Sequence, residues 1–338
     1  SLESVMKRFV LFASILLTGI LAACGSTTTP APKANLRVMH ASPDAGLLDI
    51  SLDDKNFLTV VPFKDAIRFN QVDAGKRSIK FATTAVTTGT TTTASVPLLN
   101  VSQDLVEGRF YTVIAANNVA AIEPLVIEED STEPAAGKLR LRVVHAAPAA
   151  PAVDIYISTS ADATSIATET ATIGNLAFKA APPALDIAPG EYYVRVTGAN
   201  SKTVIFDSGK ATLSTGANLT LVAVEQSGAT SPISLVNLTR NYLIPRSEIV
   251  DNVAQVRVVH ASPDAPAVDA ILEDATKVAT ALTYSTASAY ALTKAGPHTL
   301  TITGAGTTTP ALVTSTLALT GSTSYSVFVM GLAASPVG

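Results

Sequence analysis

Three closely similar 14-residue segments recur at domain-length spacing along the chain. They read LRVMHASPDAGLLD from Leu36, LRVVHAAPAAPAVD from Leu141 and VRVVHASPDAPAVD from Val256, with seven of the 14 positions identical in all three. Their histidines, His40, His145 and His260, lie 105 and then 115 residues apart. These periods are too long for a solenoid repeat and match domains of about 100 residues, the size of a two-sheet β-sandwich. The repeat therefore predicts three tandem copies of one domain.

The remainder of each copy is typical of β-structure. Glycine turns precede alternating runs such as RSIKF, EYYVRV and PHTLTI, which are rich in Val, Ile, Thr and Tyr. The chain shows no convincing helical period, and the Thr-rich residues 83–93 are interpreted equally well as a hairpin or a solvated loop. We predict an all-β chain of three tandem immunoglobulin-like β-sandwich domains, at residues 36–128, 139–240 and 256–338.

The third copy differs from the other two near its end. The first copy continues into a strand at Ile122–Ile127 and the second into one at Ile233–Leu238, whereas the third reaches Tyr325–Met330 and the last strand is missing or very short. An open sheet edge invites strand addition from a partner or a neighbouring copy. The alternative is a shorter domain whose tail covers the edge.

Composition excludes several classes of protein. A single Cys cannot form an intrachain disulfide or a Cys-based zinc site. A net charge of −4 argues against nucleic-acid binding, which requires a basic surface. With 47% hydrophobic residues, the chain is too apolar to be disordered.

Residues 1–23 have the character of a signal peptide that begins its basic part at Lys7 and continues through an apolar run from Phe9 to Ile20. The following Leu-Ala-Ala-Cys resembles the bacterial lipobox, which implies that Cys24 carries a lipid and that the chain is cut before it. An ordinary secretory signal is the alternative. We expect residues 24–35 to be a lipidated Cys and a Thr/Pro tether, and the protein to be anchored to a bacterial membrane in the cell envelope, facing outside the cytoplasm.

The R-V-V-H-A-S-P-D-A-P-A-V-D signature resembles the bacterial family called domain of unknown function 4397. The resemblance extends over nearly the whole mature chain in three copies. It implies immunoglobulin-like sandwiches in secreted or lipid-anchored envelope proteins, and it implies no activity or catalytic residue.

The repeated polar residues allow two interpretations. They are Arg37, His40, Pro43 and Asp49 in the first copy, Arg142, His145, Pro148 and Asp154 in the second, and Arg257, His260, Pro263 and Asp269 in the third. In the first interpretation, His and Asp form a metal or acid/base site. In the second, which we favour, a buried imidazole hydrogen-bonds turn backbone or the Asp, and the Arg pairs with a carboxylate.

Two arguments favour the structural interpretation. A catalytic site is rarely triplicated in one chain, and one His with one Asp falls short of the three protein ligands of a catalytic zinc. The loop acid does not recur either, because Asp44 and Asp264 align with Ala149, so a calcium site there would be missing from the middle copy. His298, which occurs only in the third copy, is expected to be an exposed turn residue.

We therefore expect a non-catalytic protein without a cofactor, with a structural, adhesive or partner-binding role. Its partners would be the membrane, through Cys24, and an unknown envelope protein or glycan, with strand addition at the third domain as one mode. The alternatives are a metal-binding or hydrolytic envelope factor that uses the His/Asp motif, and a carbohydrate-binding module, which the absence of Trp disfavours.

Overall fold

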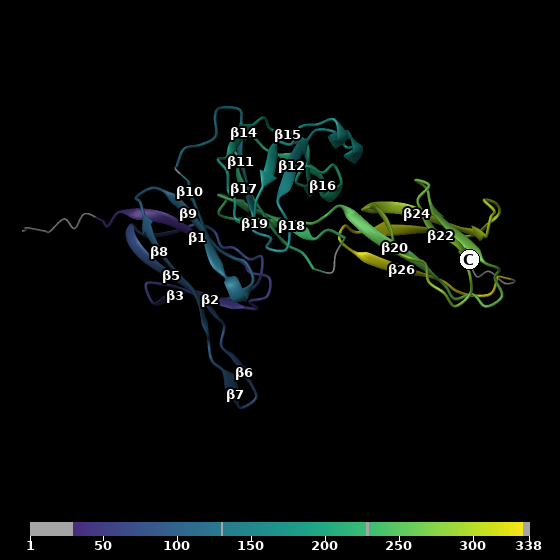
Figure 1. Cartoon of the computed structure of the whole chain (residues 1–338), viewed down its shortest axis with the longest axis horizontal. Coiled ribbons are helices and arrows are strands. Elements are labelled where there is room, and N and C mark those ends of the chain that lie inside the picture. The colour runs from purple at the N-terminus through teal and green to yellow at the C-terminus, as the bar shows by residue number, and fades with distance from the viewer. Residues whose placement is uncertain (1–29, 130, 228–229, 334–338) are drawn as a thin grey trace, which may run out of the picture. The chain divides into compact units, whose positions relative to one another are not determined.

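The computed structural model describes residues 30–129, 131–227 and 230–333, and these are built almost entirely of β-strands (Figure 1). Two short 3-10 turns, η1 (Val119–Ala121) and η2 (Ala163–Ala167), are the only helical elements in that part of the chain. This confirms the all-β prediction. Within the described residues, no helix is long and apolar enough to cross a membrane. The proposed signal peptide and Cys24 lie outside the described residues.

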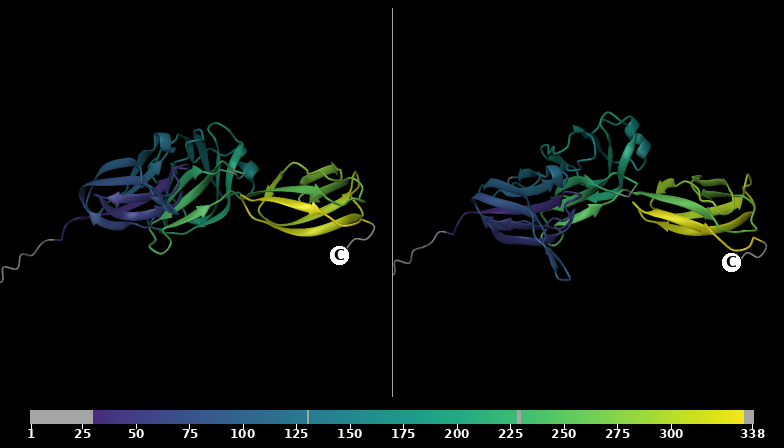
Figure 2. Two further views of the ribbon diagram at one scale, coloured as in Figure 1. Left: turned by 90° about the horizontal axis from the view of Figure 1, so that it is seen from below. Right: turned by 60° about the horizontal axis from the view of Figure 1, so that its bottom comes forward.

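The body of the chain, residues 33–338, is one compact unit that contains three two-sheet modules. In each module we call the sheet that holds the repeated His the motif sheet, and the other the second sheet. Two further views show the paired sheets of the modules (Figure 2).

Module 1 has a motif sheet in the order β10-β9-β1-β4 and a second sheet in the order β3-β2-β5-β8. A separate hairpin, β6–β7, occupies part of the Thr-rich segment. The strands are β1 Lys33–Ala41, β2 Leu48–Leu52, β3 Lys55–Val61, β4 Asn70–Asp73, β5 Gly75–Thr83, β6 Val86–Thr88, β7 Thr91–Thr93, β8 Pro97–Leu105, β9 Phe110–Ala116 and β10 Glu123–Glu129.

Module 2 has a motif sheet in the order β14-β11-β17-β18-β19 and a second sheet in the order β13-β12-β15-β16. The strands are β11 Leu139–His145, β12 Val153–Ser158, β13 Ile173–Leu176, β14 Leu185–Ile187, β15 Gly190–Gly198, β16 Val204–Leu213, β17 Asn218–Glu225, β18 Ile233–Thr239 and β19 Arg246–Ile249.

Module 3 has a three-stranded motif sheet in the order β23-β20-β26 and a second sheet in the order β22-β21-β24-β25. The strands are β20 Val253–His260, β21 Val268–Leu272, β22 Lys277–Leu282, β23 Ala291–Lys294, β24 Gly296–Gly304, β25 Ala311–Leu319 and β26 Ser324–Val329. Within the described residues, no strand lies beyond β26 in the place that β10 and β18 occupy in the other modules.

The motif strand has the same partners in every module. β1, β11 and β20 each pair in parallel with the late strand β9, β17 or β26, and antiparallel with β4, β14 or β23 on the other side. The turn after the His then carries the chain from the motif sheet to the second sheet. Because successive side chains of a strand point to opposite faces, every second residue of the motif strand faces the second sheet, as the alternating apolar residues predict.

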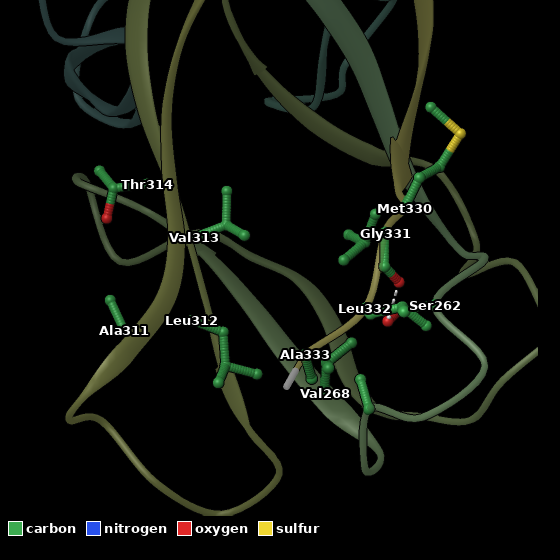
Figure 3. A pocket seen from close by; sticks show the side chains of 12 residues that line it. Ser262, Val268, Ala311, Leu312, Val313, Thr314, Met330, Gly331, Leu332 and Ala333 are labelled. Atoms are coloured by element: carbon green, nitrogen blue, oxygen red, sulfur yellow. Dashed lines mark hydrogen bonds between the residues drawn. The ribbon is translucent and has the colours of Figure 1, made fainter. Parts of the chain in front are cut away.

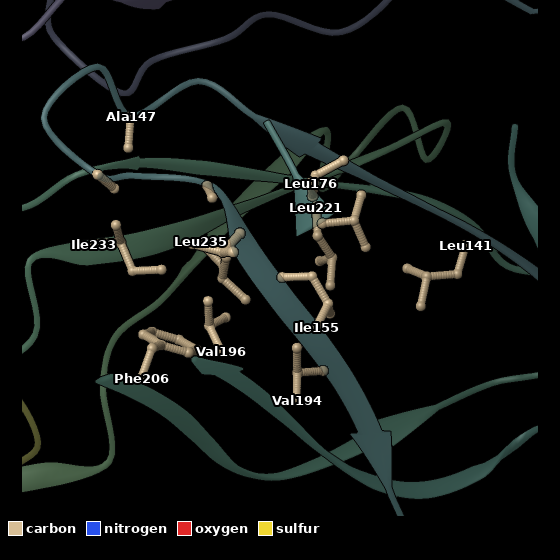
Figure 4. Packing of buried hydrophobic residues seen from close by; sticks show 14 of the residues in the cluster. Leu141, Ala147, Ile155, Leu176, Val194, Val196, Phe206, Leu221, Ile233 and Leu235 are labelled. Carbon is tan, nitrogen blue, oxygen red and sulfur yellow. The ribbon is translucent and has the colours of Figure 1, made fainter. Parts of the chain in front are cut away.

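Each module encloses its own apolar core between the two sheets. In module 2, Leu141 and Leu221 of the motif sheet pack against Ile155, Val196 and Phe206 of the second sheet (Figure 4). All five are buried. Burying apolar area of this kind is the dominant favourable term in folding, at about 25 cal/mol per Å².

Several strands extend beyond the limits of the domains predicted from the sequence. β1 begins at Lys33 rather than Leu36, because residues 33–35 pair with β4. The segment 241–252, which lies between the second and third predicted domains, contributes β19 to the motif sheet of module 2. β20 begins at Val253 rather than Val256.

Candidate functional site

The repeated His closes the turn between the two sheets. In module 1 the Ser42 N–H donates to Nδ1 of His40 at 3.3 Å, so the Nε2–H donates to the Gly46 carbonyl at 2.8 Å. The same pair of bonds forms at His145, with the Ala147 N–H and the Pro151 carbonyl.

His260 repeats the arrangement with the Ser262 N–H and the Pro266 carbonyl at 3.3 and 3.0 Å. All three imidazoles are almost wholly buried. With both ring nitrogens committed to backbone groups, no lone pair is left for a metal ion, and no ring N–H is left for a substrate.

Burial lowers the pKa of His40 and His145 below the usual 6.5, partly offset by the bond to the Gly46 or Pro151 carbonyl. The hydrogen bond to Nδ1 also lowers the pKa, because a proton on Nδ1 would face the N–H that the turn donates to it. These imidazoles are therefore neutral at pH 7.

An aromatic ring covers each His edge-on. Phe63 lies against His40, Phe178 against His145 and Tyr284 against His260, with ring centroids 6.0 to 6.2 Å apart. The segment that carries each ring is fixed by the His backbone, since the His40 N–H donates to the Asp65 carbonyl at 2.9 Å. These rings were not among the residues predicted from the sequence, although the short runs PFKDA, AFKAA and TYSTA carry them at similar places in each copy.

The repeated Asp fixes a bulge in the neighbouring strand. Asp49, Asp154 and Asp269 accept the backbone N–H of Val60, Asn175 and Ala281 at 2.7 to 2.8 Å. All three donors have a positive φ, between 46° and 58°. Each lies where the pairing of the second sheet shifts register.

The second oxygen of the carboxylate reaches another loop in two of the modules. In module 2 it accepts the Asn200 N–H, and in module 3 the Gly306 N–H, both at 2.9 Å. The structure therefore does not bring the repeated His and Asp together as a ligand pair. The His binds the backbone of the turn that follows it, and the Asp binds the backbone of the neighbouring strand.

The repeated Arg lies on the outer face of the motif sheet. Arg37 is fully buried; it donates from Nε to Thr112 at 3.1 Å and from Nη1 to the Thr239 carbonyl of module 2 at 2.9 Å. Its guanidinium lies 4.2 Å from the ring centroid of Phe69. Burial lowers the pKa of Arg37 to about 10, partly offset by the carboxylate of Glu129, so the group remains charged at pH 7.

Arg142 and Arg257 occupy the same position in the other modules. Arg142 forms an ion pair with Glu129 at 3.4 Å and donates to the Pro182 carbonyl at 2.9 Å. Arg257 donates to Ser326 at 2.9 Å and lies 4.8 Å from the ring centroid of Tyr290. Thus Arg142 has the carboxylate partner that we expected, whereas Arg257 contacts a hydroxyl group and an aromatic ring.

The loop acids have a backbone role of their own. Asp44 accepts the Val119 N–H and Asp264 the Ala333 N–H, both at 2.8 Å. The repeated prolines Pro43 and Pro263 directly precede these acids, whereas Pro148 precedes Ala149. Within the described residues, no cluster of three or more His, Cys, Asp or Glu could hold a metal ion.

His298 departs from the expectation of an exposed turn residue. It lies in β24 opposite Leu317 and is only 8% exposed. Its Nε2 bonds the Lys294 carbonyl at 2.8 Å, and its Nδ1 lies 2.9 Å from Glu273. The expectation was wrong because Gly296 and Pro297, which look like a turn, are the first residues of a strand.

An apolar groove of about 420 Å³ opens between β25 and β26, which is the edge strand of the described part of this motif sheet (Figure 3). Leu312 and Val313 lie on one side, and Val329 and Leu332 on the other, whereas the side chain of Met330 points away from the groove (Figure 3). In modules 1 and 2 the strands β10 and β18 contact β8 and β16 at the corresponding place, and these strands close the sandwich. The groove is thus the space that a further strand fills in the other two modules.

Comparisons with known proteins give a family and distant likenesses to solved structures. The family model described as Domain of unknown function (DUF4397) matches residues 34–156 and 254–337. No curated protein matches the chain.

Among solved structures, the Bacillus anthracis TIE protein is 11% identical with a TM-score of 0.20, and the match covers 88% of this chain and 50% of that one. The pneumococcal glycogen-degrading virulence factor SpuA, in a product complex, is 10% identical with a TM-score of 0.18, and the match covers 81% and 37%. The chain therefore spans about half or less of the length of these proteins. The family match covers more than half of this chain and includes all three copies of the motif, so the chain belongs to the family described as Domain of unknown function (DUF4397).

Proposed function

We propose that this chain is a non-catalytic, partner-binding protein of the bacterial cell envelope, built from three copies of the family domain and anchored by a lipid at Cys24. Its binding site would be the open edge of module 3, which would receive an extended strand from a partner polypeptide. The observation that carries the proposal is the groove between β25 and β26, because a strand of the same chain fills that place in modules 1 and 2.

The backbone of β26 is suited to strand addition. The carbonyl of Thr323, just before β26, accepts the Gln255 N–H of β20 at 2.9 Å, and the Val329 carbonyl accepts the N–H of Ala261, just after β20, at 2.8 Å. Alternate residues of a strand direct their backbone groups to opposite edges, so Ser324, Ser326 and Phe328 direct theirs away from β20. Backbone N–H and C=O groups at such an edge can form hydrogen bonds with an added strand, and pockets for its alternate side chains select its sequence.

The groove also defines the chemistry of the incoming strand. Its walls are aliphatic, and Leu312 and Val313 remain 39% and 46% exposed. Every second residue of the donated strand should therefore be apolar and the segment should be free of Pro. The first part of β18 (ISLVNLT) has this pattern, because Ile233 and Leu235 alternate with Ser234 and are buried in the core of module 2.

A labelled peptide with the β18 sequence tests the proposal. We expect it to bind the full chain saturably, as measured by fluorescence anisotropy, and we expect a peptide with Val236→Pro to bind at least about tenfold more weakly because proline removes a ladder donor. In the full chain, Leu312→Arg should weaken binding. Val96→Arg, at a similarly exposed position of module 1, is the matched control and should have no effect.

Two results would overturn the strand-acceptor role. One is the absence of peptide binding, and the other is binding that neither the proline nor Leu312→Arg reduces. The anchor is tested separately: we expect Cys24→Ala to move the chain from the membrane fraction to the soluble fraction, because the variant has no thiol to carry the lipid.

A further inference from the structure

The outer faces of the first two motif sheets form a fourth apolar core. Module 1 contributes residues of β1, β9 and β10, and module 2 contributes residues of β11, β17 and β18. The cluster comprises Met39, Ala41, Ala66, Ile114, Ala116, Leu125 and Ile127 with Val144, Ala146, Val222, Val224, Val236 and Leu238. Equivalent faces of two copies of the domain therefore pack on each other.

Equivalent lysines of the two modules make polar contacts across this core, one in each direction. Lys64 of module 1 donates to Gln226 and pairs with Glu248 of module 2, while the equivalent Lys179 of module 2 pairs with Glu123 of module 1 at 2.6 Å. In an isologous interface, if one residue contacts a second, then the second contacts the first across the symmetry axis. Modules 1 and 2 thus resemble a two-fold dimer within one chain.

Module 3 carries the same face, and no partner module covers it within the described residues. The register places Phe328 opposite Val259, as Ile114 lies opposite Met39 and Val222 opposite Val144. Ile114 and Val222 are wholly buried, whereas Phe328 is 55% exposed.

Other positions of that face are also exposed in module 3. Met330, next to Ala261, is 71% exposed, and Tyr284, equivalent to Phe63 and Phe178, is 54% exposed. Exposed apolar groups gathered on one sheet face are characteristic of an interaction site. The positions that carry Lys64 and Asp65 in module 1 are Ser285 and Thr286 here, so no like charges oppose pairing at these positions.

We infer that this face of module 3 is a self-association surface, which binds the same face of module 3 in a second copy of the chain. We choose a second copy as the partner because the equivalent faces of modules 1 and 2 already pack against each other. The resulting dimer would be isologous, with Phe328 and Met330 near its centre. This inference rests on the outer face of the sheet and does not require strand addition at the edge of β26.

Sedimentation velocity of the full chain in nonionic detergent, over a range of protein concentrations, tests the surface. We expect a monomer–dimer equilibrium, and we expect Phe328→Ser to raise the dimer dissociation constant at least about tenfold, because central apolar anchors dominate interface energies. Val96→Ser removes a comparably exposed apolar side chain from module 1 and should leave the constant unchanged. Circular dichroism checks that both variants are folded.

Photocrosslinking locates the contact. Gln226, which Lys64 contacts, corresponds by strand register to Leu332, and Lys64 itself corresponds to Ser285. With p-benzoylphenylalanine in place of Ser285, we expect crosslinks to residues 330–333 of a second chain, identified as intermolecular in a mixture of ¹⁴N- and ¹⁵N-labelled protein.

A chain that stays monomeric, a dimer indifferent to Phe328→Ser, or intermolecular crosslinks confined to another surface would overturn the inference. These outcomes are independent of the β18 peptide, which would still bind the edge of β26 in a monomer.

Discussion

The Nε2–H of His40 donates to the carbonyl oxygen of Gly46 at 2.8 Å, across the turn that joins the two sheets of module 1. The Ser42 N–H donates to the other ring nitrogen. Replacing this buried imidazole leaves a donor and an acceptor of the backbone without partners, and each unsatisfied group costs about 1–3 kcal/mol. We therefore expect His40→Ala to lower the free energy of unfolding by about 2–4 kcal/mol, as measured by urea denaturation.

Val96→Ala is the control for this measurement. Val96 is more than half exposed, and its truncation should change the free energy of unfolding by less than about 0.5 kcal/mol. If His40→Ala cost no more than this control, the imidazole would have no role in holding the turn.

The buried imidazoles also make stability depend on pH. Burial holds the pKa of His40 and His145 below 6.5 in the folded state, whereas the unfolded chain takes up protons near 6.5. Well above pH 6.5 both states are neutral, and these two histidines add no pH dependence. Below it the unfolded state binds more protons, so the free energy of unfolding falls, by at most about 1.4 kcal/mol per pH unit for each histidine.

The slope is measured from urea midpoints between pH 7.5 and 5.5. His40→Gln removes one titrating group, so its stability should fall less steeply than that of the unaltered chain. Equal slopes for the two proteins would show that His40 takes up its proton equally well in both states.

Part of this arrangement can be predicted from sequence. The alternation of Leu36, Val38 and His40 places the imidazole on the core side of its strand, and the following Ser-Pro indicates a turn. The opposite face is harder to interpret, because Met39 is buried by module 2 rather than exposed. Apolar residues at 39, 114, 144 and 222 indicate that this outer face is buried. The residues that they pack against lie about 100 residues away in the chain, and no local sequence pattern identifies those residues.

The bulges could not be predicted for a different reason. Val60 and Ala281 adopt a positive φ, which β-branched and other non-glycine residues rarely do. The conformation is held from outside by the carboxylates of Asp49 and Asp269. Sequence rules that look for Gly or Asn at such positions find only the third case, Asn175.

Asp269 allows this bulge contact to be tested. Its two oxygens accept the Ala281 N–H at 2.7 Å and the Gly306 N–H at 2.9 Å, and these bonds hold the pKa of Asp269 below 3.8. Asp269→Asn would direct an NH₂ group at one of the two N–H donors. We expect a loss of about 1–3 kcal/mol at pH 7, measured by urea denaturation.

The destabilisation caused by Asp269→Asn should become smaller at low pH. A carboxyl with a depressed folded pKa contributes stability above its unfolded value, and that contribution disappears as pH falls through the folded pKa. The difference between Asp269→Asn and the unaltered chain should therefore narrow below pH 3.8. A difference that stayed constant through this range would contradict the ionised carboxylate as the acceptor.

Glu129 is the carboxylate on which the interface of modules 1 and 2 depends. It pairs with Arg142 at 3.4 Å and Arg240 at 3.1 Å, its side chain is only 9% exposed, and its charge also stabilises the buried Arg37. Removing one partner of a buried ion pair leaves uncompensated charge. We expect Glu129→Ala to lower the free energy of unfolding of this pair of modules by about 2–4 kcal/mol.

The neighbouring residue provides the matched control. Glu128 is 46% exposed and pairs with Arg109 at 3.7 Å, so Glu128→Ala should cost less than about 1 kcal/mol, as exposed ion pairs do. Calorimetry should show modules 1 and 2 unfolding together in the unaltered chain, because they share an apolar core. In Glu129→Ala this shared transition should move to lower temperature or divide in two. Equal losses for the two glutamate variants would show that the buried carboxylate does not hold the modules together.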